Sequence, residues 1–126
     1  MLSSGIDMIE IARIERALNR HGERFLRRFF TEQEIRFCES RPSRLAGRFA
    51  VKEAVSKALG TGIGAFNWTD VEIVSDGLGK PDVVLHNSAR EMASEQGLDQ
   101  WSISISHTET HAIGLAIAIG GQVQHV

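Results

Sequence analysis

Two carboxylates and a lysine are the residues of this 126-residue chain whose types and spacing best suit chemistry on a phosphate group. Glu53 and Lys57 lie four residues apart in a stretch with helical periodicity, so they share one face of the expected helix. Asp7 lies at the end of an expected strand between two apolar residues, where an unpaired carboxylate is costly. If Asp7 and Glu53 converge, they form the pair of oxygen ligands that Mg²⁺ commonly takes from a protein.

Each of these residues also has a purely structural interpretation. A Glu53–Lys57 pair, taken alone, is more often a surface ion pair on a solvated helix. Asp7 alone would cap the helix that follows it. The two acids lie 46 residues apart, so their spacing does not show that they converge.

The expected helix also carries Arg48 and Lys52, and its cations would meet phosphate charge next to a bound metal. It runs directly into Gly60-Thr61-Gly62-Ile63-Gly64. This loop lacks the Gly-Lys-Ser/Thr ending of a P-loop, and no strand leads into it as a dinucleotide-binding fingerprint requires. It is therefore either a tight connection or a segment whose backbone lets a ligand approach closely. His107 ends an alternating strand, where a histidine more often packs or forms hydrogen bonds than catalyses.

The elements that must position these residues mix helices and strands without regular βαβ crossovers. We therefore predict an α+β domain with an antiparallel sheet packed against helices. Alternation predicts strands over 3–8, 69–75, 82–85, 101–107 and 112–119, and helical spacing and caps predict helices over 10–21, from Thr31, over 44–59, and from a cap at Asn87 to Gly97. A loop is expected at 61–67 and a turn at 76–81. The small residues of 112–119 form one face, which lets a helix pack closely on the sheet.

The length suits a single domain over residues 1–126, with 119–126 as a loose tail. One cysteine, Cys38, excludes an internal disulfide and is expected to be a buried structural thiol. No histidine–cysteine cluster favours zinc. The sequence shows no secretory signal and no apolar stretch long enough for a bilayer, so we expect a cytoplasmic protein without a membrane partner.

The charge is unevenly distributed along the chain. Residues 13–28 hold six arginines and two glutamates, a net of +4 within a chain of −2, which leaves −6 for the rest. The total gives no sign of a nucleic-acid partner. A basic patch on an acidic body favours an acidic partner or ligand, although a solvated basic helix face would look the same.

Several segments together resemble one known family. They are residues 5–13, 30–34, 45–63, 79–81 and 104–107, which match in order and with compatible gaps across residues 5–119. The most specific is Lys52-Glu53-x-x-x-Lys57 inside the longer match at 45–63. The chain resembles the holo-[acyl-carrier-protein] synthases, the short form of the 4′-phosphopantetheinyl transferases.

The resemblance implies a reaction and a set of roles. Coenzyme A would donate 4′-phosphopantetheine to a serine of apo acyl carrier protein and release adenosine 3′,5′-bisphosphate, with Mg²⁺, in fatty acid biosynthesis. Asp7 and Glu53 would hold the metal, and Glu53 and Lys57 would be catalytic, with Glu53 a candidate base. The expected coenzyme contacts are Arg48, Lys52, Lys57, Gly60, Gly62 and His107, and the expected carrier-protein contacts are Arg13, Arg20 and Arg24. The family is typically trimeric, with active sites between subunits.

Two other functions stay open at this stage. The chain could be a binding module whose basic helix docks an acidic partner, with Asp7 and Glu53 merely structural. It could also be a magnesium enzyme that hydrolyses a nucleotide pyrophosphate. The binding module would ignore magnesium, and the hydrolase would turn over without an acceptor.

Overall fold

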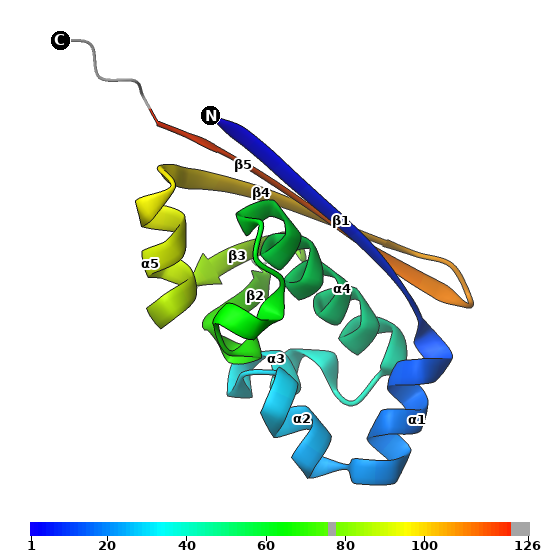
Figure 1. Cartoon of the computed structure of the whole chain (residues 1–126). Coiled ribbons are helices and arrows are strands. Elements are labelled where there is room, and N and C mark those ends of the chain that lie inside the picture. The colour runs from blue at the N-terminus through cyan, green and yellow to red at the C-terminus, as the bar shows by residue number, and fades with distance from the viewer. Residues whose placement is uncertain (76–77, 122–126) are drawn as a thin grey trace, which may run out of the picture.

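The computed structural model describes residues 1–75 and 78–121, which form helices packed on antiparallel strands (Figure 1). The predicted α+β class is confirmed. In chain order the elements are β1 (Leu2–Glu10), α1 (Ile11–His21), α2 (Glu23–Phe29), α3 (Glu32–Cys38), α4 (Pro42–Leu59), the 3₁₀ turns η1 (Ile63–Ala65) and η2 (Trp68–Asp70), β2 (Val71–Ser75), β3 (Pro81–Leu85), α5 (Asn87–Glu95), β4 (Leu98–His107) and β5 (His111–Gly120).

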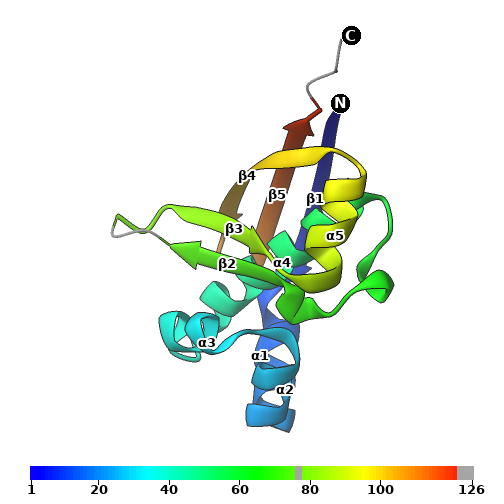
Figure 2. The ribbon, with the colours of Figure 1, turned by 90° about the vertical axis from the view of Figure 1, so that its left-hand side faces the viewer.

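Two antiparallel sheets frame the molecule. One has the order β1-β5-β4, and the other is the β2–β3 hairpin, which projects to one side in Figure 2. The small residues predicted to form one face of β5 lie buried under α4, and they include Ala112, Gly114 and Ala116. A Cβ on Gly114 would lie 2.4 Å from the Val51 nitrogen, so only glycine permits this approach. Asp7 pairs with Gly114 in the sheet, which brings α4 close to Asp7.

Helix α4 lies at the centre of the molecule and contributes to two hydrophobic cores. Val51, Val55 and Leu59 pack with β2, α5, β4 and β5. Leu45 and Ala50 pack with α1, α2 and α3. Because α4 is covered on most sides, the polar groups that it carries have fixed directions.

Helix α3 begins as its capping signal predicts. The Thr31 hydroxyl accepts a hydrogen bond from the Glu34 amide at 3.2 Å, and the Glu34 carboxylate accepts from the Thr31 amide at 2.8 Å. Cys38 at its other end is buried as expected, and burial raises the pKa of the thiol to about 11. This thiol is therefore protonated and unreactive at neutral pH.

Some predicted boundaries were wrong. Asn87 is the first residue of α5 rather than its cap. Its side-chain amide donates to the Asp70 carboxylate at 3.0 Å. Helix α2 was not predicted, and residues 68–70 form a 3₁₀ turn before β2 begins. Ile119 and Gly120 belong to β5 and not to a tail, while 122–126 and residues 76–77 of the predicted turn lie outside the described residues. Of the described helices, none has the length and apolar character to cross a membrane.

Candidate active site

Asp7 and Lys57 meet at the surface between β1 and α4. The Lys57 Nζ atom lies 3.0 Å from the Asp7 Oδ1 atom and donates to the Ile6 carbonyl at 3.0 Å. The Lys57 side chain is 51% exposed and the Asp7 side chain 21% exposed, so a ligand can reach both. Asp7 is therefore paired, and it does not cap α1, whose N-cap is Glu10.

Glu53 completes this group, which we call the acidic site (Asp7, Glu53 and Lys57). Burial raises the pKa of Glu53, the charge of Asp7 raises it further, and Lys57 partly opposes both effects. Because the charge of Asp7 acts on the pKa of Glu53, the two carboxylates lie near each other. A half-buried carboxylate beside a like charge is a common feature of functional sites.

The acidic site suits a divalent cation of the magnesium type. Within residues 1–75 and 78–121, no three or more His, Cys, Asp or Glu side chains gather as a metal site. A cation at Asp7 and Glu53 would therefore take two protein carboxylates and fill its shell with water and phosphate oxygens, which is the habit of Mg²⁺. The repulsion between the two acids would be relieved by such an ion.

The glycine loop begins one turn beyond Lys57. Gly60 ends α4 in the left-handed conformation at φ 82°, and its amide donates to the Lys57 carbonyl at 3.0 Å. Gly62 also has a positive φ, 69°. A Cβ built at Gly60 or Gly62 meets nothing within 4 Å, so both glycines are required by the backbone conformation and the space beside them is open.

A second group of expected residues lines a cavity of about 420 Å³ on another side of α4. We call it the basic cavity. Its lining includes Phe37, Arg44, Arg48, Lys80 and His107, and it includes none of the acidic-site residues. The three matched segments around Arg48, Lys80 and His107 thus converge in space. Within the chain, α4 separates the basic cavity from the acidic site.

Arg48 is the most buried charge of the basic cavity. Its guanidinium lies over the Phe37 ring at 4.2 Å and donates to the Ser75 hydroxyl at 3.0 Å. Burial lowers the pKa of this guanidinium. Its Nε atom is buried with no hydrogen-bond partner in the described part of the chain. A buried donor without a partner is costly, and an anion in the cavity would satisfy it.

Comparisons with known proteins identify the family of the chain. The profile of the 4′-phosphopantetheinyl transferase superfamily matches residues 3–116. The chain is 47% identical over 120 residues to a holo-[acyl-carrier-protein] synthase of Moorella thermoacetica, which covers 93% of each chain. The crystal structure of the Helicobacter pylori holo-[acyl-carrier-protein] synthase with coenzyme A matches with a TM-score of 0.84 and 37% identity, over 92% of this chain and 99% of that chain. The chain belongs to the holo-[acyl-carrier-protein] synthase family. It is thus a phosphopantetheinyl transferase by family, which disfavours a pure binding module.

One residue expected to bind the coenzyme lies elsewhere. Lys52, within the most specific motif shared with the synthase family, is fully buried and forms an ion pair with Glu34 at 2.9 Å. It also donates to the carbonyls of Trp68 and Val71. All three ammonium hydrogens thus have protein acceptors, so the expected contact of Lys52 with the coenzyme was wrong.

The three arginines expected to meet the carrier protein of a synthase are all exposed. Arg13 and Arg20 lie on α1, and Arg24 lies on α2. None of the three forms an ion pair within the described part of the chain, whereas Arg27 pairs with Glu23 at 2.9 Å. Their charges are therefore available to an acidic partner.

Sequence reasoning missed several residues of this synthase. Glu34 was recognised as half of a capping box, but nothing in its spacing indicated the ion pair with Lys52. Lys80 lies in the matched Gly79-Lys80-Pro81 segment, which was the signal for its place in the basic cavity. Phe37 and Arg44 carried no signal in the sequence.

Proposed function

We propose that the protein transfers 4′-phosphopantetheine from coenzyme A to a serine of apo acyl carrier protein and releases adenosine 3′,5′-bisphosphate. The transfer depends on Mg²⁺ and serves fatty acid biosynthesis in the cytoplasm. The observation that carries this proposal is the acidic site, where Lys57 pairs with Asp7 at 3.0 Å beside Glu53. Curated relatives with the synthase name and family structures solved with coenzyme A support the same reaction.

The acidic site would act on the pyrophosphate of coenzyme A. Mg²⁺ held by Asp7 and Glu53 would neutralise phosphate charge as the bond to the leaving group breaks. The ammonium group of Lys57 donates to phosphate oxygens and stabilises the leaving bisphosphate. The serine oxygen attacks the β-phosphorus, the bond from that phosphorus to the bridging oxygen breaks, and the bridging oxygen leaves on the adenosine bisphosphate.

Glu53 is the candidate base for the serine proton. Its pKa is raised by burial and by the charge of Asp7, which makes it a stronger base than an ordinary glutamate. The attacking hydroxyl belongs to the carrier protein, so the synthase itself needs no activated serine. Positioning and charge neutralisation supply most of the rate enhancement in phosphoryl transfer.

The basic cavity would hold the other end of the coenzyme. Arg48 and His107 offer donors to an anionic group, and the unpartnered Nε atom of Arg48 supports such a contact. Gly60 and Gly62 leave open space beside Lys57, through which a ligand can approach the backbone.

The acidic site and the basic cavity lie on different sides of α4, so we propose that complete active sites form between subunits of a homotrimer. The outer face of the β1-β5-β4 sheet supports this, because its apolar side chains are exposed; Ile6 is 60% exposed and Met8 is 61% exposed. Such a face is unusual on a monomer. Ile6 adjoins Asp7, and its carbonyl binds Lys57, so a subunit covering this face would lie against the acidic site.

Carrier-protein docking is the role proposed for Arg13, Arg20 and Arg24. Exposed arginines steer an acidic partner towards the site and are screened by salt.

The proposed reaction is tested by weighing the acceptor. The purified protein is mixed with apo acyl carrier protein, coenzyme A and Mg²⁺, and the intact mass of the carrier protein is measured. A gain of one phosphopantetheine group that a chelator abolishes is the expected result. Release of adenosine bisphosphate without an acceptor would favour a hydrolase, and no change with several apo acceptors would favour a binding module.

The shared site is tested by mixing two inactive variants. Glu53→Gln disables the acidic site and Arg48→Gln disables the basic cavity, so mixed oligomers contain some sites with both halves intact. Recovery of activity after the subunits exchange supports sites between subunits. Persistent inactivity in verified mixed oligomers would mean that each site is built within one subunit.

A further inference from the structure

We infer that the buried Lys52–Glu34 ion pair is a positioning device for the acidic site. It fixes the orientation of α4 so that Glu53 lies correctly against Asp7 for metal binding. This inference rests on the proposed magnesium-dependent transfer. Neither residue touches the reacting atoms.

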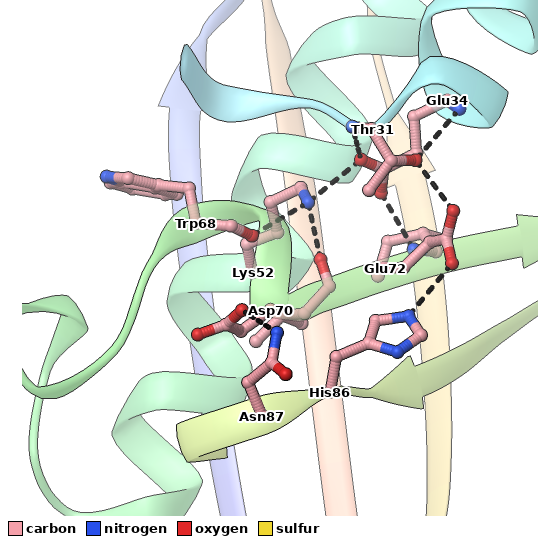
Figure 3. A network of polar contacts seen from close by, with 10 residues as sticks. Thr31, Glu34, Lys52, Trp68, Asp70, Glu72, His86 and Asn87 are labelled. Carbon is pink, nitrogen blue, oxygen red and sulfur yellow. Dashed lines mark hydrogen bonds and ion pairs between the residues drawn. The ribbon is translucent and has the colours of Figure 1, made fainter. Parts of the chain in front are cut away.

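Lys52 ties α4 to two separate segments (Figure 3). Its ammonium group lies 2.9 Å from Glu34 of α3, donates to the Trp68 carbonyl of η2 at 3.0 Å, and donates to the Val71 carbonyl at the start of β2. The side chain is 0% exposed. These three directional contacts go to α3 and to the continuous segment 68–71. Together they fix the rotation and the axial position of α4 at Lys52.

Glu34 is held as firmly as Lys52. One carboxylate oxygen accepts from the Thr31 amide at 2.8 Å and pairs with Lys52, and the other accepts from the Ile73 amide of β2 at 2.7 Å. The Thr31 hydroxyl in turn donates to Glu72 at 2.7 Å, so the anchor continues into β2. The acceptor for Lys52 therefore cannot move independently of α3 and β2.

The opposite side of α4 faces the sheet, and its hydrogen bonds to β1 lie near the C-terminal end of the helix, at Lys57 and at the Ala58 carbonyl. In the middle of the helix, the backbone at Ala50 and Ala54 rests on the glycines and alanines of β1 and β5. At 100° per residue, Lys52 lies roughly 160° around the helix from Ala50 and Ala54. Apolar packing on small residues sets the distance between helix and sheet, but it is non-directional and tolerates rotation. The Lys52 anchor adds a buried, directional restraint in the middle of the helix.

The acidic site is the feature most sensitive to that restraint. Glu53 follows Lys52 directly on α4, whereas Asp7 belongs to β1. The distance between the Glu53 and Asp7 carboxylates therefore depends on how α4 is oriented against the sheet. Mg²⁺ demands near-ideal octahedral geometry. A displacement of about 1 Å is enough to change rates about 100-fold.

Stability alone does not account for this pair. Replacing a buried ion pair with apolar groups of similar volume is often neutral or stabilising, so burying two charges is a poor device for stability. Hydrogen bonds and ion pairs depend on direction, so they restrain the rotation of a helix more strictly than apolar contacts do.

The test separates positioning from stability with Lys52→Met and with the double variant Glu34→Gln/Lys52→Met. Melting temperature and the affinity for Mn²⁺ in the presence of coenzyme A, read from the free-ion electron paramagnetic resonance signal, are measured for each. Lys52→Met leaves a buried unpaired carboxylate, so it lowers both quantities. The double variant removes that charge and the glutamine oxygen can keep the cap of α3, but its NH₂ group then faces the Ile73 amide, so its melting temperature recovers in part.

The expected result is that metal affinity stays about tenfold or more below the wild type in the double variant, despite the partly recovered stability. Leu98→Ala, which leaves a cavity in the core at β4 and removes none of the polar groups of the anchor, is the matched control and lowers the melting temperature without changing metal affinity. Metal affinity that recovers together with melting temperature, or that falls equally in Leu98→Ala, would overturn the inference. A wild-type protein that binds no Mn²⁺ with coenzyme A present would instead overturn the proposed function.

Discussion

Two lysine–carboxylate pairs on α4 have the same chemistry and opposite surroundings. Lys52 and Glu34 lie 2.9 Å apart and are 0% exposed, while Lys57 and Asp7 lie 3.0 Å apart with the lysine 51% exposed. The buried pair has every donor satisfied by the protein. The exposed pair faces solvent beside a second carboxylate, Glu53, and retains donors for a ligand.

The difference follows from the position of each lysine on the helix. Five residues separate Lys52 from Lys57, which turns their side chains roughly 140° apart. One points into the space between α3 and β2, and the other points towards the end of β1. The motif that contains both lysines therefore combines a structural anchor, the buried Lys52, with a ligand-binding group, the exposed Lys57.

The largest expected difference between the two pairs is in the free energy of unfolding. Lys52→Ala leaves the Glu34 carboxylate buried and unpaired, which costs about 3–5 kcal/mol. Lys57→Ala breaks an exposed pair and costs about 0–1 kcal/mol. Urea denaturation of both variants measures the difference. Equal losses would mean that the two pairs do not differ as described.

The exposed pair should dominate activity instead. Glu53→Gln removes a metal charge and lowers turnover by roughly 100- to 1,000-fold, the range for one group that stabilises transition-state charge. The variant folds normally, because Glu53 forms no buried ion pair with any residue that the structure describes. Turnover of carrier protein at saturating coenzyme A checks this, with circular dichroism as the control for folding. Near-normal turnover at limiting Mg²⁺ would contradict the role of Glu53.

The raised pKa of Glu53 predicts two opposite pH trends. Because the pKa in the folded state lies above the ordinary value of 4.5, the metal-free protein gains stability as pH falls through that raised pKa. Metal binding needs the ionised carboxylate, so affinity falls by about tenfold per pH unit below the same pKa. Denaturation and metal titration across pH measure these trends. Glu53→Gln should lack both contributions, and a variant that keeps them would assign them to another group.

The smallest expected effect concerns the arginines that form no ion pair with residues 1–75 and 78–121. Arg13→Ala should weaken carrier-protein affinity by a few-fold and flatten its salt dependence, while coenzyme A binding is unchanged. Arg27→Ala, which removes an arginine already paired with Glu23, is the matched control. The Michaelis constant for carrier protein at several salt concentrations checks this. Identical constants for Arg13→Ala and the wild type would exclude docking at Arg13.

The architecture around α4 could be predicted from the sequence because the local sequence patterns there match the burial of the residues in the structure. The apolar stripe of α4, the stop at Gly60 and the small face of β5 each follow from spacing, and the structure confirms all three. Helix α2 was missed because the segment 23–29 is short and mostly charged, and contacts of Phe25 and Leu26 with the rest of the core stabilise it.

The site was only partly predictable. Asp7, Glu53 and Lys57 were recognised from their types and from the family motif, but their convergence depends on the approach of α4 to the sheet. Lys52 was assigned wrongly because a sequence does not show which face of a helix is covered on both sides. The tertiary partner Glu34, 18 residues earlier in the chain, decides that face.

The most direct test of the acidic site is a calorimetric titration of Mg²⁺ into the protein with coenzyme A bound, for the wild type and for Asp7→Asn. We predict that the wild type binds one ion per site and that Asp7→Asn, with its fold intact, loses most of that affinity. Unchanged Mg²⁺ affinity in a folded Asp7→Asn protein would contradict the assignment of Asp7 and Glu53 as the metal ligands.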